Sequence, residues 1–254
     1  MEKFGMDYQV STEDKRVGTG IEGLDGLLQG GYPQGSVTLV AGTPGTGKTI
    51  VCFQYINAGI KNREKCLFLT SDERIYNLVG QAKKIGFDFD AAMQSGQLKF
   101  MYLDLEKRTV HNEMEAEIRI GNYSRVVLDS LTPLSEIPVW VVSRGSEIIP
   151  PEDMVTSAPI PIDSIQATRM HVRRLLRILE EDDCTALVTS EITEGSRNLS
   201  RDSVSEFLVD GILVLDLDPS MDRRKLTVRK MRGTKHTLKP RDIEIRSEGG
   251  IRVL

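Results

Sequence analysis

The chain has 254 residues, 39% of them hydrophobic, and a formal net charge of −4. This composition supports a sizeable core, and the length fits one α/β domain. No run of about eighteen apolar residues is present, so no membrane span is expected. Residues 1–16 lack the apolar stretch of a signal peptide, which favours a cytoplasmic protein. The three cysteines are far apart and form no CxxC pair, which argues against a zinc site or a disulfide framework.

The first three quarters of the sequence alternate between apolar strand-like runs and helical patterns. In chain order the expected elements are a strand at 36–41, a helix at 49–61, a strand at 66–70, a helix at 75–85, a strand at 98–103, a helix at 113–120, a strand at 125–129, a helix at 165–179 and a strand at 185–190. Such alternation is typical of a parallel sheet with helices on its faces.

The pattern changes after Phe207, where apolar runs follow one another with no helical pattern between them. These runs cover residues 211–217, 226–231, 243–245 and 251–254. The predicted fold class is therefore α/β, a mainly parallel central sheet flanked by helices, with antiparallel C-terminal strands. Five of the ten prolines lie between Pro138 and Pro161, together with the only tryptophan. Because proline at this density cannot build a helix interior or a central strand, residues 138–162 are predicted to be a loop.

The segment that follows the first strand matches the pattern G-x-x-x-x-G-K-[ST] at every fixed position. It reads Gly42, Thr43, Pro44, Gly45, Thr46, Gly47, Lys48 and Thr49, and the predicted nucleotide contacts extend to Ile50. Glycines let backbone N–H groups surround phosphate oxygens, and the following helix adds its positive N-terminal end. Lys48 is expected to neutralise the β- and γ-phosphates, and the Thr49 hydroxyl to coordinate Mg²⁺. The segment therefore predicts binding of Mg-ATP.

An aspartate, Asp129, ends the apolar run at 125–129. In P-loop proteins a carboxylate at the end of such a strand is the second group associated with Mg²⁺, so Asp129 is a predicted metal and nucleotide residue. The alternative is an ordinary acid at the end of a strand.

Two acids, Asp72 and Glu73, follow the second strand. A carboxylate at this position could orient or deprotonate the water that attacks the γ-phosphate. The alternative is helix capping, because an acid in the first turn of a helix interacts favourably with the helix dipole. Both roles can coexist, with Glu73 doing the chemistry and Asp72 capping the helix.

Basic residues are concentrated between Asp222 and Arg241, where nine lysines or arginines stand against one acid. Strand alternation places Lys230 and Arg232 on one face, about 7 Å apart, where they could clamp a γ-phosphate bound to a neighbouring subunit. A solvated basic strand or a nucleic-acid footprint would produce the same composition. The absence of a guanine-recognition signature favours ATP over GTP.

Several segments resemble the KaiC branch of the RecA-type ATPases. They are Gly20–Asp25, Gly30-Gly31 with Pro33, Thr70–Glu73, Ser205–Asp210 and, most specifically, Lys230–His236. The resemblance spans residues 17–254 and implies a single RecA-like domain after a short segment at 1–16. It further implies a homo-oligomeric ring, usually of six subunits and of the type common in archaea. In such a ring ATP lies between subunits, with Lys48, Thr49 and Asp129 on one side and Lys230 and Arg232 from the neighbour.

Three departures limit what the resemblance implies. The clock protein has two such domains, the first acid of its glutamate pair is Asp72 here, and the loop at 138–162 is longer than the usual connection. Clock function and autokinase activity therefore do not transfer. The leading hypothesis is an ATP-hydrolysing, oligomeric switch that acts on a protein signalling partner. The alternatives are a DNA-binding recombinase paralogue, which the acidic total charge disfavours, and an ATP-binding scaffold with little turnover.

Overall fold

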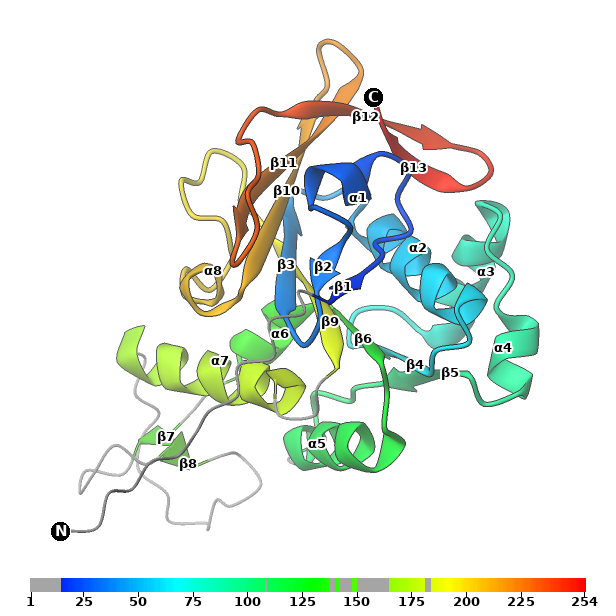
Figure 1. The fold of residues 1–254 in the computed structure, drawn as a ribbon. Helices are drawn as coiled ribbons and strands as arrows, with labels where there is room; N and C mark the ends of the chain where they lie inside the picture. Colours follow the sequence, from blue (N-terminus) through cyan, green and yellow to red (C-terminus); the bar gives the residue numbers. More distant parts are fainter. Residues whose placement is uncertain (1–14, 108, 138–139, 142–147, 150–164, 181–183) are drawn as a thin grey trace, which may run out of the picture.

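The computed structural model describes residues 15–107, 109–137, 140–141, 148–149, 165–180 and 184–254. A nine-stranded sheet runs through it in the order β13-β12-β11-β10-β3-β9-β6-β4-β5 (Figure 1). Its strands are β3 (Val37–Gly42), β4 (Cys66–Thr70), β5 (Leu98–Tyr102), β6 (Arg125–Asp129), β9 (Thr185–Glu191), β10 (Gly211–Asp218), β11 (Arg223–Met231), β12 (Arg241–Arg246) and β13 (Gly250–Val253). The strands from β10 to β5 pair in parallel, whereas β11, β12 and β13 pair antiparallel. The predicted fold class is confirmed.

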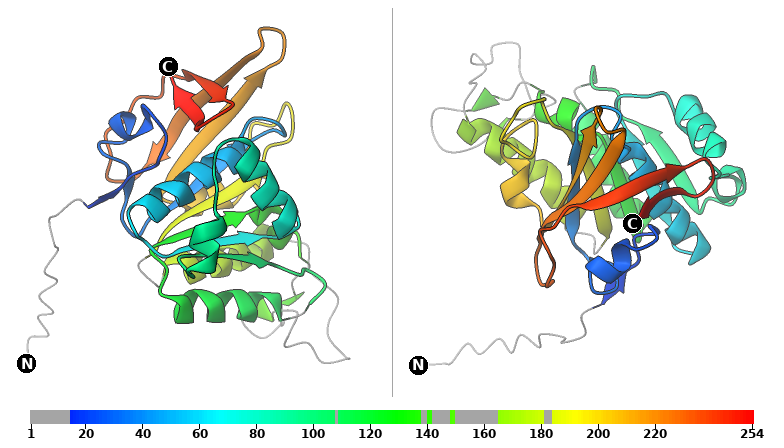
Figure 2. Two further views of the ribbon diagram at one scale, coloured as in Figure 1. Left: turned by 90° about the vertical axis from the view of Figure 1, so that its right-hand side faces the viewer. Right: turned by 90° about the horizontal axis from the view of Figure 1, so that it is seen from above.

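Helices cover both faces of the sheet (Figure 2). One face carries α2 (Lys48–Lys61), α3 (Ile75–Lys84) and α4 (Asp90–Gln94), and the other carries α5 (Val110–Gly121), α6 (Leu131–Ser135), α7 (Ile165–Glu180) and α8 (Ser205–Leu208). Two hydrophobic clusters fill the layers, one with Phe53, Phe68 and Phe89 and the other with Leu128 and Leu175. The central strands β3 and β4 are buried along their whole length, which explains why their sequences are continuous apolar runs.

The N-terminal part of the described chain forms β1 (Arg16–Val17), α1 (Leu24–Leu27) and β2 (Tyr32–Pro33), where β1 and β2 pair antiparallel. Neither these elements nor α4 and α6 were expected from the sequence, because each has only two to five residues. Helix α6 even contains Pro133, which is tolerated because the first N–H groups of a helix have no partner within it. Within the predicted loop at 138–162, β7 (Trp140–Val141) pairs with β8 (Ile148–Ile149); its other residues lie outside the described part of the chain.

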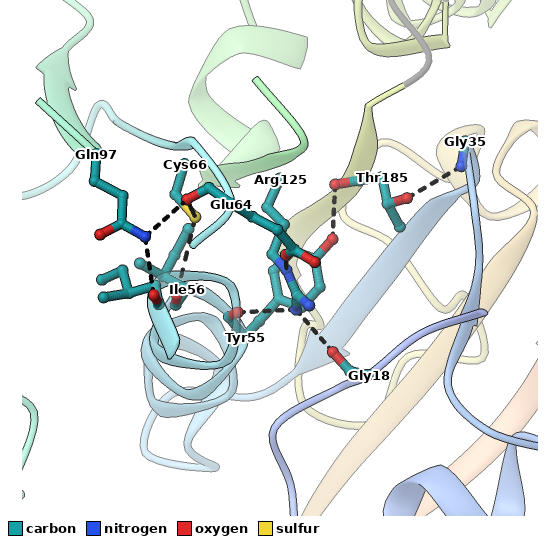
Figure 3. Close-up of polar contacts among 10 residues, drawn as sticks. Gly18, Gly35, Tyr55, Ile56, Glu64, Cys66, Gln97, Arg125 and Thr185 are labelled. Atoms are coloured by element: carbon teal, nitrogen blue, oxygen red, sulfur yellow. Dashed lines mark hydrogen bonds and ion pairs between the residues drawn. The ribbon is translucent and has the colours of Figure 1, made fainter. Parts of the chain in front are cut away.

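A buried cation ties the first residue of β6 to α2 and the N-terminal segment (Figure 3). Arg125 is fully buried and forms an ion pair with Glu64. Its Nη1 donates to the carbonyl oxygens of Gly18, at 2.7 Å, and Tyr55, at 3.1 Å. The guanidinium also lies 4.5 Å from the ring centroid of Tyr55, whose hydroxyl donates to the Thr185 carbonyl. These contacts hold together the region where the parallel strands begin.

The C-terminal ends of the parallel strands lie on the opposite side of the sheet from Arg125, along the strand direction. The sheet register pairs Gly42 with Glu191 and Thr70 with Asp129, so four strand ends lie side by side. In open α/β sheets, ligands bind outside these carboxyl ends. The fold therefore gathers the glycine-rich segment and several acids of the sequence at one edge.

Candidate nucleotide-binding site

The glycine-rich segment forms the turn between β3 and α2. Gly45 and Gly47 have φ values of 80° and 104°, in the left-handed region that side-chain-bearing residues rarely adopt. A Cβ atom at Gly42 would lie 2.6 Å from the Leu215 carbonyl oxygen. The glycines are therefore required by the turn itself, and the turn presents backbone N–H groups at the start of α2.

The ammonium group of Lys48 lies across this turn. Its Nζ donates to the carbonyl oxygens of Gly42, at 2.9 Å, and Thr43, at 3.1 Å. Burial lowers the pKa of Lys48, and the carboxylates of Glu191 and Asp129 oppose this effect. A cation held this way can exchange two carbonyl partners for phosphate oxygens without moving far.

A hydrogen-bonded pair joins the start of α2 to the end of β6. The Thr49 hydroxyl donates to Oδ2 of Asp129 at 2.8 Å, and the Thr189 hydroxyl donates to the other carboxylate oxygen. Burial raises the pKa of Asp129, while these two hydrogen bonds lower it. A hydroxyl and a carboxylate at one point are oxygen ligands of the kind Mg²⁺ takes in nucleotide sites, where it keeps several waters. Thr49 and Asp129 therefore fit the ion that a nucleotide would bring.

The acids after β4 point to different partners. Asp72 accepts a hydrogen bond from the Ser130 hydroxyl at 2.8 Å, whereas Glu73 accepts one from the Gln81 side chain at 2.7 Å. Helix α3 begins at Ile75 with no side-chain cap and no acid in its first turn. The capping role considered for Asp72 is therefore wrong, because its carboxylate is turned toward the residue that follows β6.

A cavity of about 280 Å³ lies between these groups. Its lining is mostly polar and consists of Pro44, Lys48, Thr49, Thr70, Asp72, Glu73, Leu78, Asp129, Ser130 and Glu191. Sequence reasoning missed Glu191 and Ser130. Glu191 ends β9 just as Asp129 ends β6, so an acid closing a buried parallel strand was the available signal. The cavity combines one ammonium group with four carboxylates beside the turn.

Lys230 and Arg232 lie far from this cavity in the same chain. Met231 pairs with Gly211, which pairs with Thr38, so this end of β11 is level with the start of β3. The four residues from Thr38 to the turn at Gly42 span about 13 Å along the strand. Lys230 instead donates to three carbonyls at the end of α8, and Arg232 forms an ion pair with Asp210 at 2.9 Å.

The other end of β11 approaches the turn of its own chain. Arg224 lies near the tip of the β10–β11 hairpin, and its Nε is 3.4 Å from the carbonyl oxygen of Gly45. The basic stretch recognised in the sequence is thus divided along one strand. One end contacts the glycine-rich turn, and the other end is level with the start of β3.

Comparison with known proteins decides the family. A family model described as "ATPase: KaiC" matches residues 17–144 and 153–254. The chain belongs to the KaiC ATPase family. It is 33% identical over 243 residues to a UPF0273 protein of Methanocaldococcus jannaschii, covering 92% of this chain and 95% of the relative. It is 34% identical over 242 residues to a UPF0273 protein of Methanopyrus kandleri, covering 92% and 90%.

The circadian clock oscillator protein KaiC of Prochlorococcus marinus is a longer relative of this KaiC-family chain. It is 30% identical over 230 residues, which cover 89% of this chain but 43% of the clock protein. A crystal structure of a KaiC-like protein from Pyrococcus horikoshii has a TM-score of 0.75 and 28% identity, covering 94% and 99% of the two chains. The single RecA-like ATPase domain that the sequence resemblance implied is confirmed.

Two other features are absent from the described residues. No helix among them is long and apolar enough to cross a membrane. No group of three or more His, Cys, Asp or Glu side chains in the described part could hold a metal ion. The three cysteines are buried thiols that form no disulfide with one another.

Proposed function

We propose that this KaiC-family chain binds Mg-ATP at the β3–α2 turn and hydrolyses it at a site completed by a second copy. Backbone N–H groups of the turn and Lys48 hold the phosphates, and Thr49 and Asp129 hold Mg²⁺, which neutralises phosphate charge. Glu73 orients and deprotonates the attacking water. Lys230 and Arg232 come from the next subunit of a homo-oligomeric ring, a hexamer by analogy with the family, in the cytoplasm.

One observation carries this proposal. The cavity gathers one ammonium group and four carboxylates, whereas Lys230 and Arg232 lie at the other edge of the sheet. A single chain therefore has few cations to stabilise the charge that develops on a γ-phosphate. Lys230 and Arg232 cannot reach the cavity of their own chain. A neighbouring copy that presents its β11 end to the cavity supplies them, as an arginine finger does in trans.

The same arrangement accounts for a switch. Lys230 now donates to the carbonyls of Glu206, Phe207 and Val209 at the end of α8. Basic side chains near a helix C-terminus stabilise it by satisfying its last carbonyls. When Lys230 turns to a phosphate of the neighbouring site, α8 loses this contact. The proposed readout of nucleotide state is therefore a change at α8, available to a signalling partner.

A mixing experiment tests the shared site. Lys48→Ala and Arg232→Ala are each expected to reduce ATP hydrolysis at least about 100-fold, because one removes a cis cation and the other a trans cation. In a ring built from equal amounts of both variants, about a quarter of the interfaces pair an intact P-loop with an intact Arg232. Hydrolysis of the mixture should therefore recover to about a quarter of the wild-type rate.

The control mixes Lys48→Ala with Thr49→Ala, two P-loop variants that cannot complement each other. No recovery is expected in this mixture. If the first mixture also stays inactive although both variants bind one another, the site is not shared between subunits, and the proposed mechanism is wrong.

A further inference from the structure

The turn that carries Arg232 is held on two sides by distant parts of the chain. On one side the backbone N–H of Arg232 donates to the carbonyl oxygen of Asp210 at 2.9 Å, and the guanidinium pairs with the Asp210 carboxylate. On the other side lies the N-terminal segment that forms β1, α1 and β2. We call residues 232–235 the Arg232 turn. Its position depends on both of these neighbours.

Arg16 of β1 contacts the Arg232 turn with two donors. Its Nη1 donates to the Thr234 hydroxyl at 2.5 Å, and its Nη2 donates to the Gly233 carbonyl oxygen at 3.0 Å. Because the donors of a guanidinium lie in a rigid plane, two acceptors engaged at once fix both the distance and the orientation of the turn. The side-chain oxygen of Gln29 also accepts the backbone N–H of Lys235 at 2.9 Å. The three residues after Arg232 are thus all tied to the N-terminal segment.

A close approach of two backbones places Arg16 at this point. Gly31 has a φ of 130°, and a Cβ atom there would lie 2.3 Å from the carbonyl oxygen of Val17. Gly30 has a φ of 109°, and its Cβ would lie 3.6 Å from the Cβ of Arg16. A residue with a side chain would combine an unfavourable φ with this close approach. The glycine pair therefore sets the position from which Arg16 reaches the turn.

Arg16 is remote from the nucleotide cavity of its own chain. It borders a recess that includes Ser124 and Thr185, where β6 and β9 begin. The cavity contains Asp129 and Glu191, where the same two strands end. Four residues of strand span about 13 Å, so Arg16 cannot contact phosphates in that cavity. Its contacts with functional residues are those to the Arg232 turn.

We propose that Arg16 is a positioning residue, which holds the Arg232 turn in the place from which Arg232 reaches the nucleotide of the neighbouring subunit. The inference rests on the proposed function, because it requires Arg232 to act in trans. An untied turn would lose backbone freedom each time Arg232 met a phosphate, whereas a tied turn has already lost it. Arg16 therefore affects the rate of hydrolysis rather than nucleotide affinity, since the P-loop of each shared site belongs to the other subunit.

The first test measures kcat and KM of the full chain, with calorimetry for binding of a non-hydrolysable ATP analogue. Arg16→Ala should lower kcat at least about tenfold and leave the analogue affinity within about twofold of the wild type. Arg16→Lys keeps the charge but engages one acceptor instead of two, so its loss of kcat should be smaller. Circular dichroism and light scattering check folding and assembly.

The matched control is Arg252→Ala. Arg252 of β13 also ties the N-terminal segment to the C-terminal strands, through an ion pair with Glu22 at 3.2 Å, but it does not contact the Arg232 turn. Because this pair is exposed, Arg252→Ala should keep kcat within about twofold of the wild type.

Mixing separates a positioning role from a purely structural one. Arg16→Ala mixed with Lys48→Ala should recover to about a quarter of the wild-type rate, because about a quarter of the interfaces then join an intact P-loop to an intact turn. Arg16→Ala mixed with Arg232→Ala should show no recovery, because both changes lie on the same side of the shared site. If Arg16 acted on the site of its own subunit, the two mixtures would give the opposite results.

Those opposite results, or an Arg16→Ala variant as active as Arg252→Ala, overturn the positioning role. The shared site still stands in that case if Lys48→Ala and Arg232→Ala complement each other. Failure of that pair overturns the shared site and the positioning role together. If Arg16→Ala does not fold or assemble, Gln29→Ala, which removes the tie to Lys235, takes its place in both mixtures with the same expected outcomes.

Discussion

Strand β6 begins with a cation, Arg125, and ends with an anion, Asp129, and the two side chains have different surroundings. Arg125 is closed off, with an ion-pair partner, two carbonyl acceptors and an aromatic ring around it. Asp129 is held by two hydroxyls but borders a cavity of about 280 Å³. A buried charge whose partners are all internal contributes to the integrity of the fold, whereas one kept beside open space with a shifted pKa is available for chemistry. The contacts that stabilise the fold and the residues of the candidate site thus lie at opposite ends of the strands of one sheet.

The largest expected effect comes from Arg125→Leu, which breaks the closed end. Removing one partner of a buried ion pair and its hydrogen bonds should lower the free energy of unfolding by about 3–5 kcal/mol. ATP affinity below the unfolding transition should stay within about twofold, because Asp129 is at the other end of the strand. Urea unfolding and calorimetry measure the two quantities. Lys83→Met, which removes the exposed pairs with Asp88 and Asp90, is the control and should leave the urea midpoint almost unchanged. A similar result for Arg125→Leu would contradict a stabilising role.

The cavity beside Asp129 is tested by Glu73→Gln, which keeps the shape of the side chain but removes its basicity. Turnover should fall at least about 100-fold while ATP binding is retained, the expected result for a lost general base. Single-turnover hydrolysis of radiolabelled ATP measures the chemical step. The matched variant is Asp72→Asn, expected to have the smaller effect because the Ser130 hydroxyl already engages Asp72. If Asp72→Asn were the inactive variant and Glu73→Gln the active one, the two roles would have to be exchanged.

A smaller effect is expected from a pair of buried histidines, which lie inside the fold as Arg125 does. His111 of α5 and His171 of α7 stack edge to face, with ring centroids 5.2 Å apart. Burial, with smaller contributions from the neighbouring His171 and Arg174, lowers the pKa of His111 to about 4. The unfolded chain, with a histidine pKa near about 6.5, binds more protons between these values. Stability should therefore fall as the pH falls from about 6.5 toward about 4.

The measurement is urea unfolding at pH 7 and at pH 4.5. Replacing His111 by Leu should remove about 2 kcal/mol from the difference in stability between these conditions. His236→Asn is the control, because that residue is on the loop after β11 and should leave the difference unchanged. If His111→Leu and the wild type lost the same stability between pH 7 and pH 4.5, the His111 imidazole would not be the cause of that loss.

Local patterns predicted the parts of the molecule that depend on nearby residues. The turn from Gly42 to Thr49 and the strand ending at Asp129 were identifiable because their chemistry and their apolar runs are contiguous in the sequence. The order of parallel and antiparallel strands also followed from the change of pattern after Phe207. The turn and the strand are each encoded within about fifteen residues, and tertiary packing only reinforces them.

Contacts between distant residues were beyond the sequence. The hydrogen bond between Ser130 and Asp72 joins residues 58 apart, and the burial of Arg125 depends on Glu64, 61 residues away. Glu191 entered the cavity only through the pairing of β9 with β3. Lys230 was expected to share a strand face with Arg232 and to contact a neighbour's phosphate. Within the chain, the irregular pairing near Ile212 and the adjoining α8 give it three carbonyl acceptors. Such positions depend on the register and on which strands become neighbours, which no local pattern specifies.

The division of β11 has a consequence for any closed assembly of this chain. Its Arg224 end contacts the glycine-rich turn of its own subunit, and its Lys230 end lies about 20 Å further along the strand. In the proposed ring, β11 therefore joins each candidate nucleotide site to the following one and not to the preceding one. Nucleotide binding or release at successive sites of the proposed ring would then be coupled in one rotational direction.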